Sequence, residues 1–288
     1  MTQQAEPNEN AYPIDVEHAG EMTRLLNQDN MLTRNMGGIF PERTPDELTD
    51  IHDILDIACG PGGWVQEVAY TYPDKQVTGV DISQAMIEYA NAFIQVRHLS
   101  NALFRTMNIL QAFDFPDNSF DMVNARLLVA VVPRDRWPAL IAECYRVLRP
   151  GGILRLTETE FDITTSAALE TYLALIARMT HRFGMSFSPT GHLISITSKL
   201  PSLLRATHFQ HVNFRAHAIE YSYGTPAHSS LYQDYKAALA LGRAFVLKNA
   251  DITPQDYDQL CEQVFVEMQN EDFCDLWYLL TVWGYKPV

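Results

Sequence analysis

The sequence has 288 residues, of which 47% are hydrophobic, and a formal net charge of −14. A chain of this length buries a full core as one domain, or as one domain with a cap. An acidic balance without a Lys/Arg cluster argues against nucleic acids and anionic membrane surfaces as partners. The four cysteines lack metal-ligand or disulfide spacing, and no signal-peptide pattern or membrane-length apolar run is present. We therefore expect a cytoplasmic protein without a bound metal.

The first predicted element is a helix from Val16 to Arg34, which ends before Gly37-Gly38 and Pro41. The next element is the most informative one. An apolar strand beginning at Ile54 enters a turn of small residues, and a helix follows with apolar residues at positions i, i+3, i+4 and i+7. Such a strand–turn–helix unit brings bare backbone close to a nucleotide-like ligand.

Small residues in this turn permit close approach of a ligand, because a larger side chain would occupy its space. They are Ala58, Gly60, Gly62 and Gly63. The next predicted strand, Gln76 to Val80, is followed by Asp81, which stands 18 residues after Gly63. An acidic residue at this distance suits hydrogen bonds to ribose hydroxyls.

Three further strands are expected in order along the chain. They are Phe104 to Gln111, Ser119 to Arg126 and Ile153 to Glu158, and the last follows a Pro150-Gly151-Gly152 stop. The third strand leaves Asn108 and Ile109 at its end. Alternating strands and helices of this kind predict an α/β fold built on a mostly parallel sheet.

At this point the chain resembles the class I S-adenosylmethionine-dependent methyltransferases, over five separately placed motifs from Asp53 to Glu158. Within that superfamily it is similar to the small-molecule branch, which includes ubiquinone, menaquinone and natural-product methyltransferases. The resemblance implies a Rossmann-like, seven-stranded, mostly parallel sheet flanked by helices. It also implies S-adenosylmethionine as the cofactor and methylation of a small molecule on oxygen, carbon or nitrogen.

The resemblance implies roles for the matched positions. The backbone at Ala58, Gly60 and Gly62 would approach the methionine moiety, with Asp56 supporting the turn, and Asp81 would hold the ribose. Ala58 stands where the family usually has glycine, and its methyl group fits if φ stays negative. Four residues would contact the adenine: Ile82, Met86, Asn108 and Ile109. Asn108 departs from the aspartate most common at its position.

The resemblance also sets the expected domains. Residues 1–45 would form an N-terminal helical flap, 46–224 the cofactor-binding core, 225–272 an inserted helical lid and 273–288 the final antiparallel strand. The lid, or an oligomer contact through the same helices, is expected because this segment is longer than a plain core needs. Its second helix has a strong start signal, with Thr253 as cap and Pro254 at the first position.

Candidate catalytic residues are fewer. Glu158 is placed at the carboxyl end of the fifth strand, as a base or a stabiliser of developing positive charge, or as a solvated loop acid. His181 and His192 flank an aromatic stretch, Phe183 to Phe187, which would favour an apolar or aromatic acceptor if it lines the pocket. Arg126 follows the fourth strand and is a candidate for contact with cofactor or substrate, or for a structural ion pair.

Methyl transfer from a sulfonium is an in-line displacement, so a general base is needed only for a nucleophile that holds its proton tightly. Two other functions remain open from the sequence. One is a nicotinamide-dependent oxidoreductase, which Ala58 and the Pro150-Gly151-Gly152 motif disfavour. The other is a non-catalytic cofactor-binding protein, which the intact set of Asp56, Gly60 and Asp81 disfavours.

Overall fold

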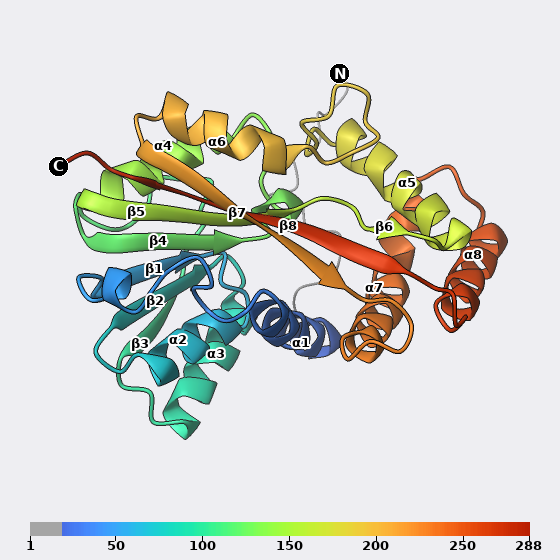
Figure 1. The fold of residues 1–288 in the computed structure, drawn as a ribbon, viewed down its shortest axis with the longest axis horizontal. Helices are drawn as coiled ribbons and strands as arrows, with labels where there is room; N and C mark the ends of the chain where they lie inside the picture. The colour runs from blue at the N-terminus through green and yellow to red at the C-terminus, as the bar shows by residue number, and fades with distance from the viewer. Residues whose placement is uncertain (1–18) are drawn as a thin grey trace, which may run out of the picture.

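In the computed structural model, which describes residues 19–288, a central sheet runs through the molecule with helices on both faces (Figure 1). The sheet has eight strands, so the expected number of seven was wrong. The additional strand, β6, has only two residues, too few for a sequence signal. The strands are β1 (Asp53–Ile57), β2 (Gln76–Asp81), β3 (Ala102–Thr106), β4 (Phe120–Arg126), β5 (Leu148–Thr159), β6 (Ile163–Thr164), β7 (Gln210–Glu220) and β8 (Asp275–Tyr285).

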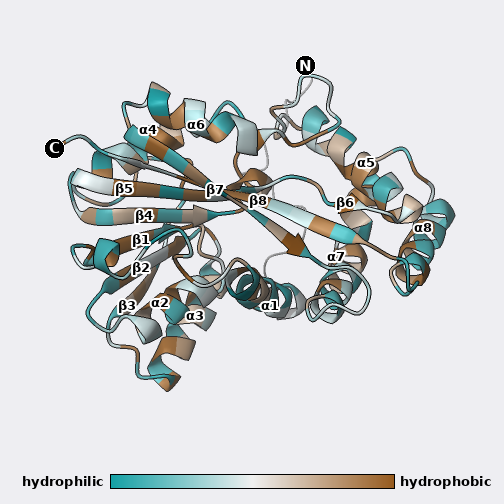
Figure 2. Ribbon diagram, in the orientation of Figure 1, coloured by the Kyte–Doolittle hydropathy of each residue, from teal (hydrophilic) through white to brown (hydrophobic). Residues whose placement is uncertain are grey.

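Helices separate β1 from β2, β2 from β3 and β4 from β5 as the sequence predicts, and two helices precede each of β7 and β8. Most show brown and teal stretches in turn along their length (Figure 2), as expected for helices with one buried face. They are α1 (Ala19–Asn35), α2 (Gly63–Thr71), α3 (Gln84–Val96), α4 (Trp137–Val147), α5 (Ala167–Arg182), α6 (Ile196–Ala206), α7 (His228–Asn249) and α8 (Pro254–Glu267). No described helix combines the length and apolarity needed to cross a bilayer.

The strand order is β3-β2-β1-β4-β5-β8-β6, and β7 also pairs with β8. Strands β1 to β5 are parallel, whereas β8 runs antiparallel to β5, β6 and β7. The antiparallel last strand was expected and is confirmed. Strand order reverses between β1 and β4, and at such a switch point the carboxyl ends of the strands leave a crevice for ligands.

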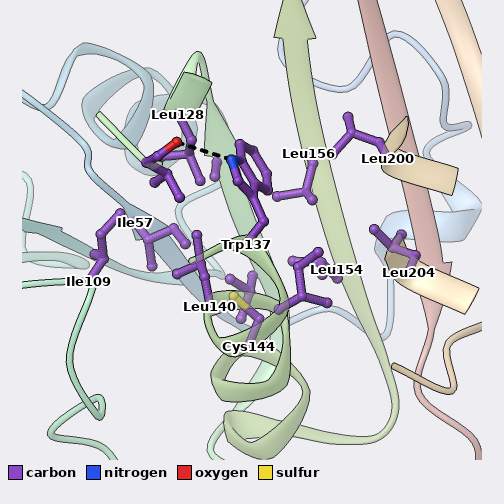
Figure 3. Close-up of a cluster of buried hydrophobic side chains, with 14 of the residues drawn as sticks. Ile57, Ile109, Leu128, Trp137, Leu140, Cys144, Leu154, Leu156, Leu200 and Leu204 are labelled. Atoms are coloured by element: carbon purple, nitrogen blue, oxygen red, sulfur yellow. Dashed lines mark hydrogen bonds between the residues drawn. The ribbon is translucent and has the colours of Figure 1, made fainter. Parts of the chain in front are cut away.

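Alternate residues of the central strands pack on opposite faces. Leu55 and Ile57 of β1 belong to the core under α4 and α6, whereas Ile54 belongs to the core under α2 and α3. Figure 3 shows the first of these cores around Trp137, whose indole Nε1 donates to the Val132 carbonyl at 3.2 Å. Trp137 is fully buried, so this bond satisfies a polar atom that is removed from water.

A third core lies beyond the crevice, where the far ends of β7 and β8 meet four helices (Figure 1). Helices α1, α5, α7 and α8 contribute buried apolar residues to it, among them Leu32, Leu169, Leu239 and Val264. Helix α1 packs beside α7 and also reaches α2. The helices expected between residues 225 and 272 are present as α7 and α8, and Thr253 caps α8 by accepting from the Asp256 N–H.

Candidate functional site

A cavity of about 340 Å³ opens at the carboxyl ends of β1, β2 and β4. This volume is within the range of pockets that bind small molecules. Residues of helix α1 and of the turn after β1 line the cavity. The remaining lining comes from the segments after β2, β3 and β4, together with Thr159 and Trp277.

The turn after β1 has three residues with positive φ. They are Ala58 at +52°, Gly60 at +53° and Gly62 at +81°. The negative φ on which the fit of the Ala58 methyl group was conditional is therefore not found. Its methyl group is held in the left-handed region, which costs on the order of 1 kcal/mol for a residue with a side chain. Strain of this kind is typical of backbone that must approach a ligand.

The glycines of this turn have different reasons to lack a side chain. A Cβ on Gly62 would lie 2.4 Å from the Phe104 ring, so Gly62 permits packing of the turn against β3 and does not line the cavity. A Cβ on Gly60 would meet only the tip of Leu25, at 4.0 Å. Gly60 does line the cavity, so a side chain there would project into open space.

Asp81 ties this turn to the end of β2. One carboxylate oxygen accepts from the Gly60 N–H at 2.9 Å, and the other accepts from the Ser83 N–H at 2.9 Å. Burial raises the pKa of Asp81, while these bonds act in the opposite direction. The side chain lines the cavity. A carboxylate fixed in this way keeps lone pairs available for hydroxyl groups of a ligand.

Asp56 lies beneath the turn as a buried carboxyl that also lines the cavity. It accepts from the Asn124 amide at 2.7 Å, and Asn124 in turn accepts from Arg155 at 2.7 Å. Arg155 pairs with Glu42 at 2.7 Å, which completes a buried polar chain. Burial raises the pKa of Asp56 to about 7.

The residues expected around an adenine come together on one side of the cavity. Ile82, Met86, Asn108 and Ile109 all line it. Ile82 is 42% exposed, so it offers an apolar surface that no described residue covers. The side-chain amide oxygen of Asn108, Oδ1, accepts from the Leu110 N–H at 2.9 Å. This bond orients the side chain and leaves its NH₂ group as a donor.

The expected contact residue Arg126 also lines the cavity, and its guanidinium forms an ion pair with Asp29 of α1. Arg126 also donates to Thr33 of α1 at 2.9 Å. A Cβ on Gly63 would lie 2.5 Å from the second Asp29 oxygen, so the carboxylate is held close to the first turn of α2. The sequence analysis missed Asp29, because nothing local distinguishes one acidic residue of a helix from another.

Glu158 is fully buried rather than a solvated loop acid. Its carboxylate accepts from the N–H groups of Leu128 and Val129, at 2.7 and 3.2 Å, and burial raises its pKa to about 8. Leu127 to Val131 form a wall of the cavity, whereas Glu158 itself is not among the lining residues. The structure therefore places Glu158 behind the wall, where it positions backbone.

The two candidate histidines lie away from the cavity, and neither lines it. His181 is half-buried near the end of α5. Its ring packs against Gly191, where an added Cβ would lie 2.7 Å from the ring. His192 is exposed. The structure thus does not bring either histidine together with Asp81 or the turn, and sequence proximity to aromatic residues was a poor indicator of the pocket.

Comparison with known proteins agrees with this geometry. Residues 54–152 match the family model of a methyltransferase domain. The demethylmenaquinone methyltransferase of Symbiobacterium thermophilum is 37% identical over 103 residues, which are 34% of this chain and 39% of that protein. The 27-O-demethylrifamycin SV methyltransferase of Amycolatopsis mediterranei is 35% identical over 136 residues, which are 47% of each chain. The match thus covers less than half the length of these curated relatives.

Among solved structures, the Haemonchus contortus phosphoethanolamine N-methyltransferase 2, in complex with S-adenosylhomocysteine, has a TM-score of 0.57 at 18% identity. The alignment covers 95% of this chain and 59% of the Haemonchus contortus chain. The cyclase SpnF has a TM-score of 0.51 at 22% identity. The alignment covers 95% of this chain and 97% of SpnF. These likenesses concern the fold.

The fold places the chain among Rossmann-like α/β proteins. Within this fold, residues 54–152 are similar to a methyltransferase domain.

Proposed function

We propose that the chain transfers a methyl group from S-adenosylmethionine to a small-molecule acceptor. The observation that carries the proposal is the cavity at the strand-order reversal, where the open backbone at Gly60 meets the Asp81 carboxylate. The family match over residues 54–152 supports it. The fit is supported by the space above Gly60, which a Cβ would enter without meeting a protein atom closer than 4.0 Å.

In this proposal each cavity residue has a defined task. Asp81 accepts from the ribose hydroxyls, and Ile82, Met86 and Ile109 enclose the adenine, whose amino group faces Asn108. The backbone at Ala58 and Gly60 lies along the methionine moiety, with Asp56 beneath it. Arg126, whose charge is balanced by Asp29, contacts the cofactor from the end of β4. When bound, S-adenosylmethionine supplies the electrophilic methyl group.

The acceptor is proposed to reach the cavity along its apolar wall. Leu25 and Leu32 of α1 face this space, together with Met107, Leu127 and Val129. Enclosure by such residues excludes water and holds the reactants in line, which is the main requirement of a displacement at a sulfonium. No His, Lys or Tyr occurs among the described residues that line the cavity. The carboxyl groups among these lining residues are those of Asp29, Asp56 and Asp81, so any proton acceptor for the reaction would come from this set.

The domain assignment remains a proposal of the same kind. Residues 1–45 would act as a flap, of which residues 19–45 are described and include α1, and the segment 225–272 as a lid or an oligomer contact. Contacts between α1 and α7 support a joint movement of the two helices, because Arg24 pairs with Asp234 at 3.0 Å. A cytoplasmic location also remains a prediction, as does the absence of nucleic-acid and membrane partners.

Thermal shift with three ligands tests the proposal. S-Adenosylhomocysteine and S-adenosylmethionine should each stabilise the protein, by about 2.7 kcal/mol at a hundredfold excess over Kd. NADH should give no shift, and stabilisation by NADH alone would replace the proposal with an oxidoreductase. Binding of the methionine derivatives without methyl transfer to any amine, phenol or alkene acceptor would favour the non-catalytic alternative.

A further inference from the structure

A second group of polar side chains lies beyond the cavity, between the sheet and the helices α5 and α7. It consists of Tyr221 and Asp275, which are fully buried, and of Asp162 and Tyr235, which are half-buried. The Tyr235 hydroxyl donates to Asp162, and Asp275 lies across from Tyr221, whose N–H donates to the Asp275 carbonyl at 2.8 Å. Burial raises the pKa of Asp162 to about 7, and the nearby negative charge of Asp234 adds to the shift.

Asp275 is the unusual member of this group. Its side chain is 0% exposed, and neither carboxylate oxygen has a hydrogen-bond partner. Burial and the charge of Asp162 raise the pKa of Asp275 to about 8, and the neighbouring Leu276 N–H opposes the shift. The Tyr221 hydroxyl is likewise buried without a partner. Polar groups buried in this way are costly unless a ligand satisfies them.

No described Lys or Arg forms an ion pair with Asp162 or Asp275. The nearby Asp234 shows the contrast, because Arg24 and Gln28 both donate to it, at 3.0 and 3.4 Å. Two carboxyl groups and two phenols thus share one buried region without a cation. Carboxylates and the faces of aromatic rings both attract positive charge, and the attraction is strongest where water is excluded.

Trp277 connects this group to the cavity. Residues two apart in a strand point to the same face, so Trp277 and Asp275 of β8 lie on one side of the sheet. The Trp277 ring packs 6.2 Å from that of Tyr221, and its Nε1 donates to Thr159. Both Trp277 and Thr159 line the cavity. The acidic group therefore lies behind Trp277, which separates it from the cavity.

We propose that Asp275, Asp162, Tyr221 and Tyr235, with Trp277 at the entrance, form a subsite for a positively charged nitrogen of the acceptor. The inference rests on the proposed function, since it names a class of acceptor for the same cavity. The ligand class is an organic ammonium ion of small size. The apolar wall from Leu127 to Val131 would contact the uncharged part of such a molecule.

Calorimetry tests the subsite with choline and ethanolamine as cationic probes and with 3,3-dimethylbutan-1-ol as the uncharged analogue of choline. The protein is first saturated with S-adenosylhomocysteine. This step separates the proposed methyl transfer from the proposed ammonium subsite, because failure of the first titration contradicts the proposed function alone. At least one cationic probe should bind, and at least tenfold more tightly than the uncharged alcohol. Binding of neither cation, or equal binding of choline and its analogue, would overturn the subsite.

Asp275→Asn removes the charge while keeping the shape, and Asp258→Asn, at an exposed ion pair on α8, is the matched control. We expect Asp275→Asn to weaken binding of the cationic probe at least tenfold and to leave the affinity for S-adenosylhomocysteine unchanged. The ligand-free variant should also melt at a higher temperature at neutral pH, because Asp275 must take up a proton when it is buried on folding and asparagine need not. Unchanged probe affinity, or a lower melting temperature with folded protein, would show a structural role and overturn the inference.

Discussion

The carboxylate of Glu158 accepts a hydrogen bond from the Leu128 backbone N–H at 2.7 Å, across the turn that forms one wall of the cavity. Val129 donates to the second oxygen at 3.2 Å. The residue before this pair, Leu127, has a φ of +58°, in the left-handed region that non-glycine residues rarely adopt. The buried acid therefore holds a strained segment in place, which explains why it sits behind the pocket.

Glu158→Gln should destabilise the protein, because the amide NH₂ cannot accept from a backbone N–H. One buried donor then loses its partner, which costs about 1–3 kcal/mol. Urea unfolding measures the loss, and Glu170→Gln on the exposed side of α5 serves as the control. A Glu158→Gln variant as stable as wild type would show that the carboxyl does not hold the wall.

Gly60→Ala tests close approach of the ligand to the backbone. The change should cost about 1 kcal/mol of folding free energy, since Ala58 already tolerates the same φ in this turn. The affinity for S-adenosylhomocysteine should fall by tenfold or more, equivalent to about 1.4 kcal/mol, because the methyl group enters the ligand's space. Isothermal titration measures this, with Ala58→Gly as a control that keeps its affinity. A Gly60→Ala protein with full affinity would place the ligand elsewhere.

Asp81→Asn should weaken binding of S-adenosylhomocysteine by about 1.5–3 kcal/mol, because hydrogen bonds from the ribose to a charged acceptor are lost. Asp74→Asn, an exposed residue just before β2, is the matched control. Since Asp81 also accepts from Gly60 and Ser83, thermal unfolding of the ligand-free variant must be measured in parallel. Undiminished affinity in a folded Asp81→Asn variant would remove the ribose assignment.

These positions show what the sequence can reveal. Asp81 and the small residues of the turn were predictable, because their function depends on spacing along one strand–turn–helix unit. Asp29 was not, since its pairing with Arg126 depends on how α1 crosses the sheet. The role of Glu158 was missed for a similar reason: its partners, Leu128 and Val129, lie 30 and 29 residues away in the sequence.

The ion pair between Asp29 and Arg126 predicts that the stability losses caused by substitutions at the two positions are not additive. Arg126→Met leaves the Asp29 carboxylate, which is 23% exposed, without its cation and should cost about 1–3 kcal/mol. Asp29→Leu combined with Arg126→Met should recover much of that loss, because no uncompensated charge remains. Chemical denaturation of the two single variants and the double variant measures the coupling. Additive losses would mean that the pair does not anchor α1.

Stability should fall as pH rises from 6.5 to 8. Burial raises the pKa of Asp56 to about 7 and that of Glu158 and Asp275 to about 8, so these groups are protonated in the folded protein at pH values where the unfolded chain has released its protons. The stabilisation by these protonated groups is complete below their pKa values in the unfolded chain, which are near 4. It is lost as the pH rises through their pKa values in the folded protein. His217, with its pKa lowered to about 4, opposes this trend only below pH 6.5.

Melting temperature measured across this window checks the prediction, with Asp275→Asn giving a flatter profile. A melting temperature that rises from pH 6.5 to 8 would contradict the burial of these acids.

The most direct test of the central claim is a crystal structure of the protein with S-adenosylhomocysteine. We predict the ribose hydroxyls on the Asp81 carboxylate, the adenine between Ile82 and Ile109, and the sulfur above the backbone of Gly60. A ligand bound outside this cavity, or an empty cavity at saturating ligand, would contradict the account.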